Sequence, residues 1–135
     1  MSLPRAKLTK NFPGCPVEAT LSFLDGKWKG VILFHLMDGT LRFNELRRKL
    51  PAITQRMLTK QLRELEDGGL VSRTVFAVVP PRVEYALTAL GDTMRPVIEA
   101  LAVWGEQNVF CHPDGRRLRD VVAERELAAF APVEA

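Results

Sequence analysis

The sequence has little of what builds a disulfide scaffold, a metal centre or a catalytic site. Its two cysteines, Cys15 and Cys111, lie far apart and form no CxxC or CxxH pair. Its two histidines, His35 and His112, also lack metal-ligand spacing. No Gly-rich phosphate loop is present, and no Ser, His and Asp set can be argued from spacing. We therefore expect no catalytic residue, no metal, no cofactor and no enzymatic activity.

Long apolar runs are also missing. No run approaches the roughly 20 residues that cross a bilayer. The N-terminal segment MSLPRAKLTKNFPG is basic but lacks the apolar stretch of a secretory signal. Hydrophobic residues nevertheless make up 47% of the 135 residues, enough for an ordinary domain with a core. These features predict a folded, cytoplasmic protein with no membrane partner.

A large excess of one charge is absent, because the net charge is only +3. The distribution is more informative. Eight basic and four acidic residues fall between Arg42 and Arg73, whereas five basic and eight acidic residues follow from Thr88 to the end. Positive charge is thus concentrated in one segment. This distribution fits nucleic-acid binding, and it fits a merely solvated helix surface equally well.

The basic segment has the pattern of a helix, a tight turn, a second helix and a β-hairpin. The second helix is predicted over Thr54–Glu66, with Thr54 as its N-cap. One face of it is apolar. The other face carries cationic and hydroxyl side chains at i, i+3, i+4 and i+7, namely Arg56, Thr59, Lys60 and Arg63. A helix with these two faces suits docking in the major groove of DNA.

The elements around this helix are predicted from caps, breakers and periodicity. Cys15-Pro16 is expected to open a helix, with Pro16 as its first residue. Further helices are expected over Lys27–Met37 with Asp25 as its cap, over Asn44–Leu50 and over Ala89–Val109. Pro96 should kink the last of these or delay its start. Thr40–Phe43 is a possible minor strand. Val71–Val79 and Arg82–Leu87 are predicted strands, and Pro80-Pro81 marks the tip between them.

Several motifs in this order resemble one family. They are Cys15-Pro16-Val17-Glu18, Gly26-Lys27-Trp28, Leu41-Arg42-Phe43-Asn44-Glu45-Leu46, Ile53–Thr59, Leu62–Val71 and Pro80–Gly91, followed by Trp104. Together they resemble the HxlR family of bacterial transcriptional regulators, relatives of the MarR group, over about residues 14–108. The resemblance implies a dimer that binds a two-fold operator and represses, or sometimes activates, nearby genes.

The expected fold is mostly α with a small β-hairpin wing, a dimeric winged helix-turn-helix. Residues 1–13 are predicted to be a flexible basic arm. Residues 14–110 are predicted to form the DNA-binding and dimerisation domain, and 111–135 a turn and short helix. The main alternative is a winged-helix protein-interaction module that does not bind DNA. A small-molecule-binding protein that uses the Trp28 region is a second alternative.

Double-stranded DNA is the expected partner, and each candidate contact has a chemical reason. Gln55 and Arg56 lie in the first turn, where a recognition helix meets base edges. Thr59 suits a thymine methyl, and Lys60 and Arg63 suit phosphates. The remaining candidates are Thr54, Arg42 and Asn44 at helix starts and Arg82 at the hairpin tip, for a phosphate or the minor groove. Each of these side chains can also be read as ordinary solvated surface.

Two further sets of residues concern assembly and signalling. The candidate dimer interface consists of Val17, Leu21, Leu90, Met94, Val97, Leu101 and Trp104. Cys15 is the candidate redox or electrophile sensor, because a helix N-terminus favours the thiolate and because some members of the resembling family sense through the matching cysteine. A cysteine without a signalling role is the equal alternative. A small ligand at the dimer interface is the other possible effector.

Overall fold

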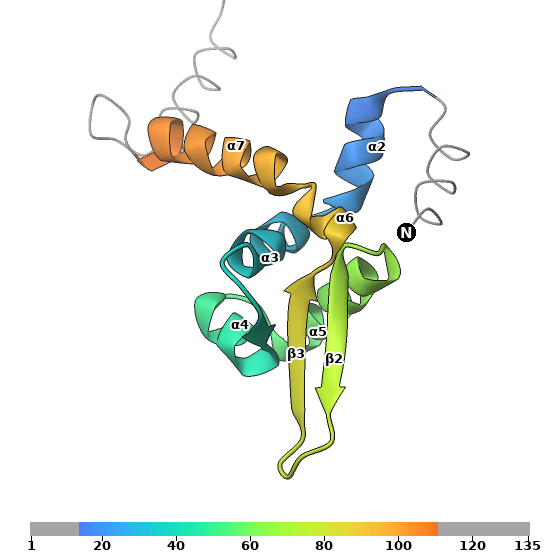
Figure 1. Cartoon of the computed structure of the whole chain (residues 1–135). Coiled ribbons are helices and arrows are strands. Elements are labelled where there is room, and N and C mark those ends of the chain that lie inside the picture. Colours follow the sequence, from blue (N-terminus) through green and yellow to red (C-terminus); the bar gives the residue numbers. More distant parts are fainter. Residues whose placement is uncertain (1–13, 111–135) are drawn as a thin grey trace, which may run out of the picture. The chain divides into compact units, whose positions relative to one another are not determined.

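The computed structural model describes residues 14–110 (Figure 1). The chain divides into two compact units, Met1–Pro96 and Val97–Ala135, and each is described by itself. The predicted arm at 1–13 and the predicted segment at 111–135, with Cys111, lie outside the described residues. Within 14–110, no helix has the length and apolarity needed to span a membrane.

The first unit contains short helices around a small sheet. Its elements are α2 (Pro16–Phe23), α3 (Trp28–Leu36), β1 (Leu41–Arg42), α4 (Phe43–Lys49), α5 (Gln55–Asp67), β2 (Val71–Phe76), β3 (Arg82–Leu87) and α6 (Ala89–Asp92). Pro16 is the first residue of α2, as predicted, since an N–H there has no acceptor within the helix. The Thr54 hydroxyl accepts the Met57 N–H at 3.0 Å, which confirms the predicted cap of α5.

The three strands form an antiparallel sheet in the order β1-β3-β2. Leu41 of β1 pairs with Tyr85 of β3, so the predicted minor strand is confirmed. The hairpin register runs from Val71 opposite Leu87 to Phe76 opposite Arg82. The prediction that the first hairpin strand reaches Val79 is wrong, because the chain turns locally after Phe76, where the Val78 N–H bonds to the Phe76 carbonyl at 2.9 Å.

The core lies between α3, α4, α5 and the sheet. Its fully buried side chains are Ile32, Leu33, Leu46, Leu58, Leu62, Leu65, Leu70 and Val71. Helix α3 contacts α4, α5 and β3, and it therefore lies at the centre of the core. The apolar side of α5 supplies Leu58, Leu62 and Leu65, so burial of this side turns the other side of the helix outward.

One local prediction is wrong, and the structure decides between the two alternatives at Pro96. The residue before α3 is Lys27, without a side-chain cap, and the Asp25 carbonyl instead accepts from Lys29 Nζ at 3.4 Å. The single helix predicted over Ala89–Val109 is divided. Helix α6 ends at Asp92, and a new helix starts at Arg95 because Pro96 fits only the first turn of a helix.

The second helix of this division, α7 (Arg95–Gly105), is followed by the π-helical turn η1 (Glu106–Phe110). From Val97 onward these elements belong to the second unit. The alternative that Pro96 delays the start of the helix is therefore the correct one. At the end of the first unit, the Arg95 guanidinium donates to the Asp92 carboxylate at 2.8 Å and to the Met37 carbonyl at 3.2 Å.

A partly buried ion pair joins α3 to α5. Lys29 Nζ lies 3.3 Å from Glu64 Oε1, and the Lys29 side chain is 9% exposed whereas that of Glu64 is 42% exposed. Glu64→Ala leaves a buried ammonium with only the Asp25 carbonyl, so we expect the free energy of unfolding to fall by about 2 kcal/mol. Lys29→Met should cost less than about 1 kcal/mol, because an apolar chain replaces the stem and Glu64 returns to water.

Urea denaturation of the two variants and of Glu66→Ala measures this asymmetry. Glu66 is an exposed acid on the same helix, so its replacement should change stability by at most about 0.5 kcal/mol. Equal losses for Glu64→Ala and Lys29→Met, or a larger loss for the lysine variant, would show that the pair is an ordinary surface contact.

Candidate nucleic-acid interface

The outward face of α5 consists of polar and cationic side chains. Arg56, Thr59, Lys60 and Arg63 are all exposed, and so is Gln55. The buried leucines of the same helix hold this face outward. The predicted division of the helix into an apolar and a basic face is therefore confirmed, and the predicted contacts of α5 lie together on one surface.

The start of α5 decides which side chains stand at its tip. Because Thr54 is the cap, Gln55 and Arg56 are the first two helical residues, and both have long side chains with several donors. One turn later, the Thr59 hydroxyl donates to the Gln55 carbonyl at 2.9 Å. The hydroxyl proton is thus used within the helix, and the methyl group of Thr59 is the part suited to an apolar contact such as a thymine methyl.

The start of α4 carries two other predicted contacts. Arg42 is the N-cap of α4, and its N–H donates to Glu45 Oε1 at 2.9 Å. Glu45 therefore occupies one of the backbone donors that an anion would use at this helix end. The exposed side chains of Arg42 and Asn44 are consequently better suited to a phosphate than the helix terminus itself.

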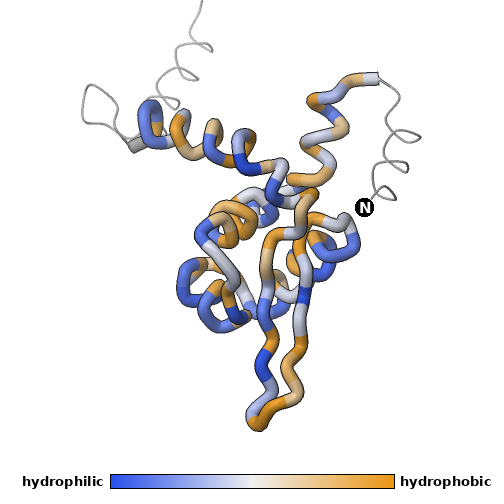
Figure 2. The backbone as a smooth tube through the Cα atoms, in the orientation of Figure 1, coloured by the Kyte–Doolittle hydropathy of each residue, from blue (hydrophilic) through white to orange (hydrophobic). Residues whose placement is uncertain are grey.

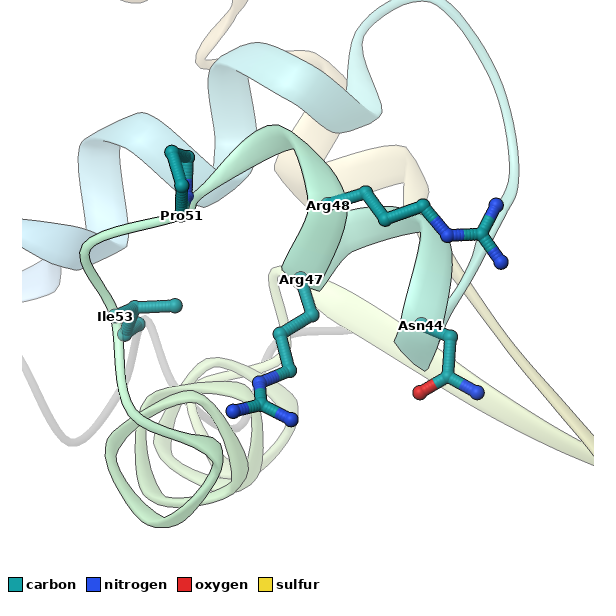
Figure 3. Close-up of a pocket in the computed structure, with 5 residues that line it drawn as sticks. All are labelled: Asn44, Arg47, Arg48, Pro51 and Ile53. Carbon is teal, nitrogen blue, oxygen red and sulfur yellow. The ribbon is translucent and has the colours of Figure 1, made fainter.

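A hollow of about 370 Å³ opens between α4 and the turn that leads to α5. Figure 3 shows Asn44, Arg47 and Arg48 projecting from α4, with Pro51 and Ile53 supplied by the following turn. In the sequence, Arg47 and Arg48 stand out only as two of the basic residues between Arg42 and Arg73. Their spacing to Asn44, i+3 and i+4, places all three on one face of the helix and is the signal that could have identified them.

Arg82 lies beside the hairpin tip rather than on it. It is the first residue of β3 and pairs with Phe76 across the hairpin. Its guanidinium carbon lies 4.4 Å from the centre of the Phe76 ring, and its Nε lies 3.1 Å from Glu84 Oε2. The side chain is 39% exposed. Arg82 is therefore held in place by two partners before any ligand binds.

His35, in α3, adds no positive charge to this surface. Burial lowers the pKa of His35, and the positive charge of Lys49 lowers it further against the opposing effect of Asp38. His35 is thus neutral at pH 7 and does not contribute to the positive surface. Within residues 14–110, no cluster of His, Cys, Asp or Glu side chains could hold a metal ion.

The residues predicted for assembly and sensing are mostly exposed. Val17 and Leu21 on α2 are exposed, as are Val97, Leu101 and Trp104 on α7, whereas Leu90 and Met94 are half-buried. Cys15 is an exposed free thiol at the N-cap of α2, where its side chain makes no capping hydrogen bond. Each of these side chains outside the half-buried pair is accessible in the described part of the chain.

Known proteins with similar sequences include HTH-type transcriptional regulators. The sequence is 58% identical over 97 residues to the uncharacterized HTH-type transcriptional regulator YdeP of Bacillus subtilis (strain 168), covering 72% of this chain and 76% of that protein. It is 40% identical over 106 residues to YtfH of Escherichia coli (strain K12), another uncharacterized HTH-type transcriptional regulator, covering 78% of this chain and 82% of that protein.

Solved structures give the same result. The redox regulator HypR in its oxidized form has a TM-score of 0.67 at 56% identity, covering 70% of this chain and 97% of that one. The reduced form of the transcriptional regulator YodB from B. subtilis has a TM-score of 0.61 at 39% identity, covering 74% and 97%. The predicted winged helix-turn-helix fold is confirmed by these similarities. Because the family model described as HxlR-like helix-turn-helix matches residues 23–113, more than half of the sequence, this chain belongs to the HxlR-like helix-turn-helix family.

Proposed function

We propose that this protein is a DNA-binding transcriptional regulator that acts in the cytoplasm, as a homodimer on a two-fold operator, most often to repress transcription. The observation that carries the proposal is the outward face of α5. Gln55, Arg56, Thr59, Lys60 and Arg63 are exposed together on a helix whose opposite side is anchored in the core. A basic helix presented in this way fits the major groove, and a protein-interaction module has no need of it.

The contacts divide into two groups. Gln55 and Arg56, at the tip of α5, contact base edges, and the Thr59 methyl meets a thymine. Lys60 and Arg63 contact phosphates, as do Thr54, Arg42, Asn44 and, at the wing, Arg82. The hollow beside α4 adds Arg47 and Arg48 to the phosphate contacts, because both line it next to Asn44. Phosphate contacts position the helix, and base contacts select the sequence.

Exposed apolar side chains on two helices support the homodimer, and a two-fold operator would match its symmetry. We propose that residues 14–110 contain both the DNA-binding and the dimerisation surfaces. The proposed interface uses Val17 and Leu21 of α2 together with Leu90, Met94, Val97, Leu101 and Trp104. Two-fold pairing would place the two α5 helices about one turn of DNA, roughly 34 Å, apart.

Fluorescence anisotropy with DNA from upstream of the protein's own gene tests the function. Supporting results are tight binding and a steep loss of affinity as salt rises, since each neutralised phosphate releases counterions. Absence of binding even at low salt, to this DNA and to unrelated DNA, would instead support the protein-interaction module.

Cys15 is the proposed point at which a redox or electrophile signal enters. Its thiol is exposed at the start of α2, and the similar protein HypR is a redox regulator with oxidized and reduced structures. We expect Cys15→Ser to keep the DNA affinity of the parent and to lose the response to diamide, which oxidises thiols. The measurement is DNA anisotropy before and after diamide treatment.

Cys111→Ser serves as the matched control for this prediction. If Cys15 acts through modification of its own thiol, the control responds to diamide as the parent does. If Cys111 is the resolving partner, both variants lose the response together. A Cys15→Ser protein that responds like the parent would rule out the sensor role. The remaining candidate effector would then be a small ligand at the dimer interface.

A further inference from the structure

The tip of the wing is an exposed apolar segment. The wing tip, Ala77–Pro81, joins β2 to β3 and contains no charged side chain. All five residues are exposed; Val79 is 100% exposed and Val78 is 51% exposed. Figure 2 shows hydrophobic residues at this end of the hairpin. A contiguous exposed apolar segment of this kind is typical of an interaction surface.

The chemistry of the wing tip excludes most phosphate contacts. It has no cation, and Pro80 and Pro81 have no N–H to donate. The Val78 N–H is already bonded to the Phe76 carbonyl at 2.9 Å. A contact between this tip and DNA must therefore be mainly apolar, through the side chains of Val79 and its proline neighbours.

The stem behind the tip is well braced. Six residue pairs join β2 to β3 in continuous register, from Val71–Leu87 to Phe76–Arg82. The last pair is reinforced because the Arg82 guanidinium lies over the Phe76 ring and beside Glu84. Such a stem can hold a small apolar tip against a surface without bending. It also keeps the Arg82 cation directly behind the tip.

We propose that the wing tip enters the minor groove of the operator and that Val79, with Pro80, wedges between two base pairs and kinks the duplex. This inference rests on the proposed function, since it needs α5 to hold the protein on DNA. Apolar side chains, proline among them, insert between base steps in this way and bend DNA by about 20–90°. Arg82, directly behind the wedge, would contact a backbone phosphate beside the kinked step.

The wedge also makes a prediction about sequence preference. Pyrimidine–purine steps unstack at lower cost than other steps, so TA or CA steps should be enriched where the wing meets the DNA. This preference would arise at positions that no side chain reads by hydrogen bonding. Selection of bound fragments from random-sequence duplexes provides both the site and this statistic.

The test compares two exposed valines on the selected duplex. Val79→Ser removes the wedge, whereas Val75→Ser changes a stem valine that is 54% exposed. The bend is measured by energy transfer between labelled DNA ends, and unstacking by 2-aminopurine fluorescence at the wing step. We expect Val79→Ser to lose most of the bend and of the fluorescence rise, with affinity falling less than about tenfold because the α5 contacts persist. Val75→Ser should match the parent.

The outcomes separate the wedge from the proposed function. If the parent selects and bends DNA but Val79→Ser bends it equally, the wedge is wrong and the regulator stands. If the parent binds its selected site without bending or unstacking, the wedge is again wrong. If the parent selects no DNA, the proposed function fails first. Val79→Ala, a milder change at the same exposed position, should lie between the parent and Val79→Ser in bend angle.

Discussion

Replacing Arg56 with alanine is expected to weaken operator binding by about 1–3 kcal/mol at each half-site, a loss of about 5- to 150-fold per half-site. The side chain stands on the second residue of α5 and is exposed. Its planar guanidinium offers two parallel donors, which match the O6 and N7 acceptors of guanine. The loss should be accompanied by relaxed sequence preference at one position, which competition with single-base variants of the site would measure.

Arg56→Lys separates base reading from charge. Lysine keeps the positive charge but lacks the planar pair of donors, so discrimination should fall although much of the non-specific affinity persists. Lys60→Ala is the complementary variant, expected to weaken all sequences alike and to reduce the salt dependence by about one phosphate contact. If Arg56→Ala behaves as predicted for Lys60→Ala, then Arg56 contacts a phosphate and the base reader is another residue.

Gly91→Ala is expected to lower the free energy of unfolding by about 3 kcal/mol. Gly91 is buried in α6, and a Cβ placed on it would lie 2.0 Å from the Leu70 carbonyl oxygen and 3.0 Å from the carbonyl carbon. These are backbone atoms, and the same oxygen accepts the Thr88 N–H at 3.1 Å. Relief of the clash therefore requires α6 to move away from the start of β2.

Gly30→Ala is the matched control for this effect. Gly30 lies within α3, and a Cβ there meets nothing within 4 Å, so alanine should stabilise the protein by about 0.5–1 kcal/mol through helix propensity. Thermal and urea unfolding of the two variants measures the difference. A Gly91→Ala protein as stable as the parent would mean that α6 and β2 can separate at little cost.

Helix α5 could be predicted from the sequence almost to the residue. Thr54 has a side chain that caps helices, and the 3.6-residue repeat of Leu58, Leu62 and Leu65 marks the inner side. Gly69, with φ +81°, takes the left-handed conformation that glycine favours beyond the end of a helix. These signals depend on residues that lie close together in the sequence, so they can be identified without the tertiary structure.

Two positions show where local signals did not decide the structure. Asp25 is a good cap by residue type, but α3 begins two residues later than an Asp25 cap would require. Pro96 is compatible with a kink or with a new helix start, and the chain adopts the new start after a turn at Thr93-Met94. Local propensity allowed both alternatives, so packing decided between them.

By itself, the amino-acid sequence determined the order of the elements, the two faces of α5 and the membership of the family, because caps, periodicity and motifs are properties of neighbouring residues. Only the tertiary structure decided which distant groups meet. It set Lys29 against Glu64 and Gly91 against the Leu70 carbonyl, and it placed Arg82 over the Phe76 ring across the hairpin, leaving Val79 at the tip. Such contacts depend on the packing of whole helices and strands against one another, a property that no short stretch of sequence contains.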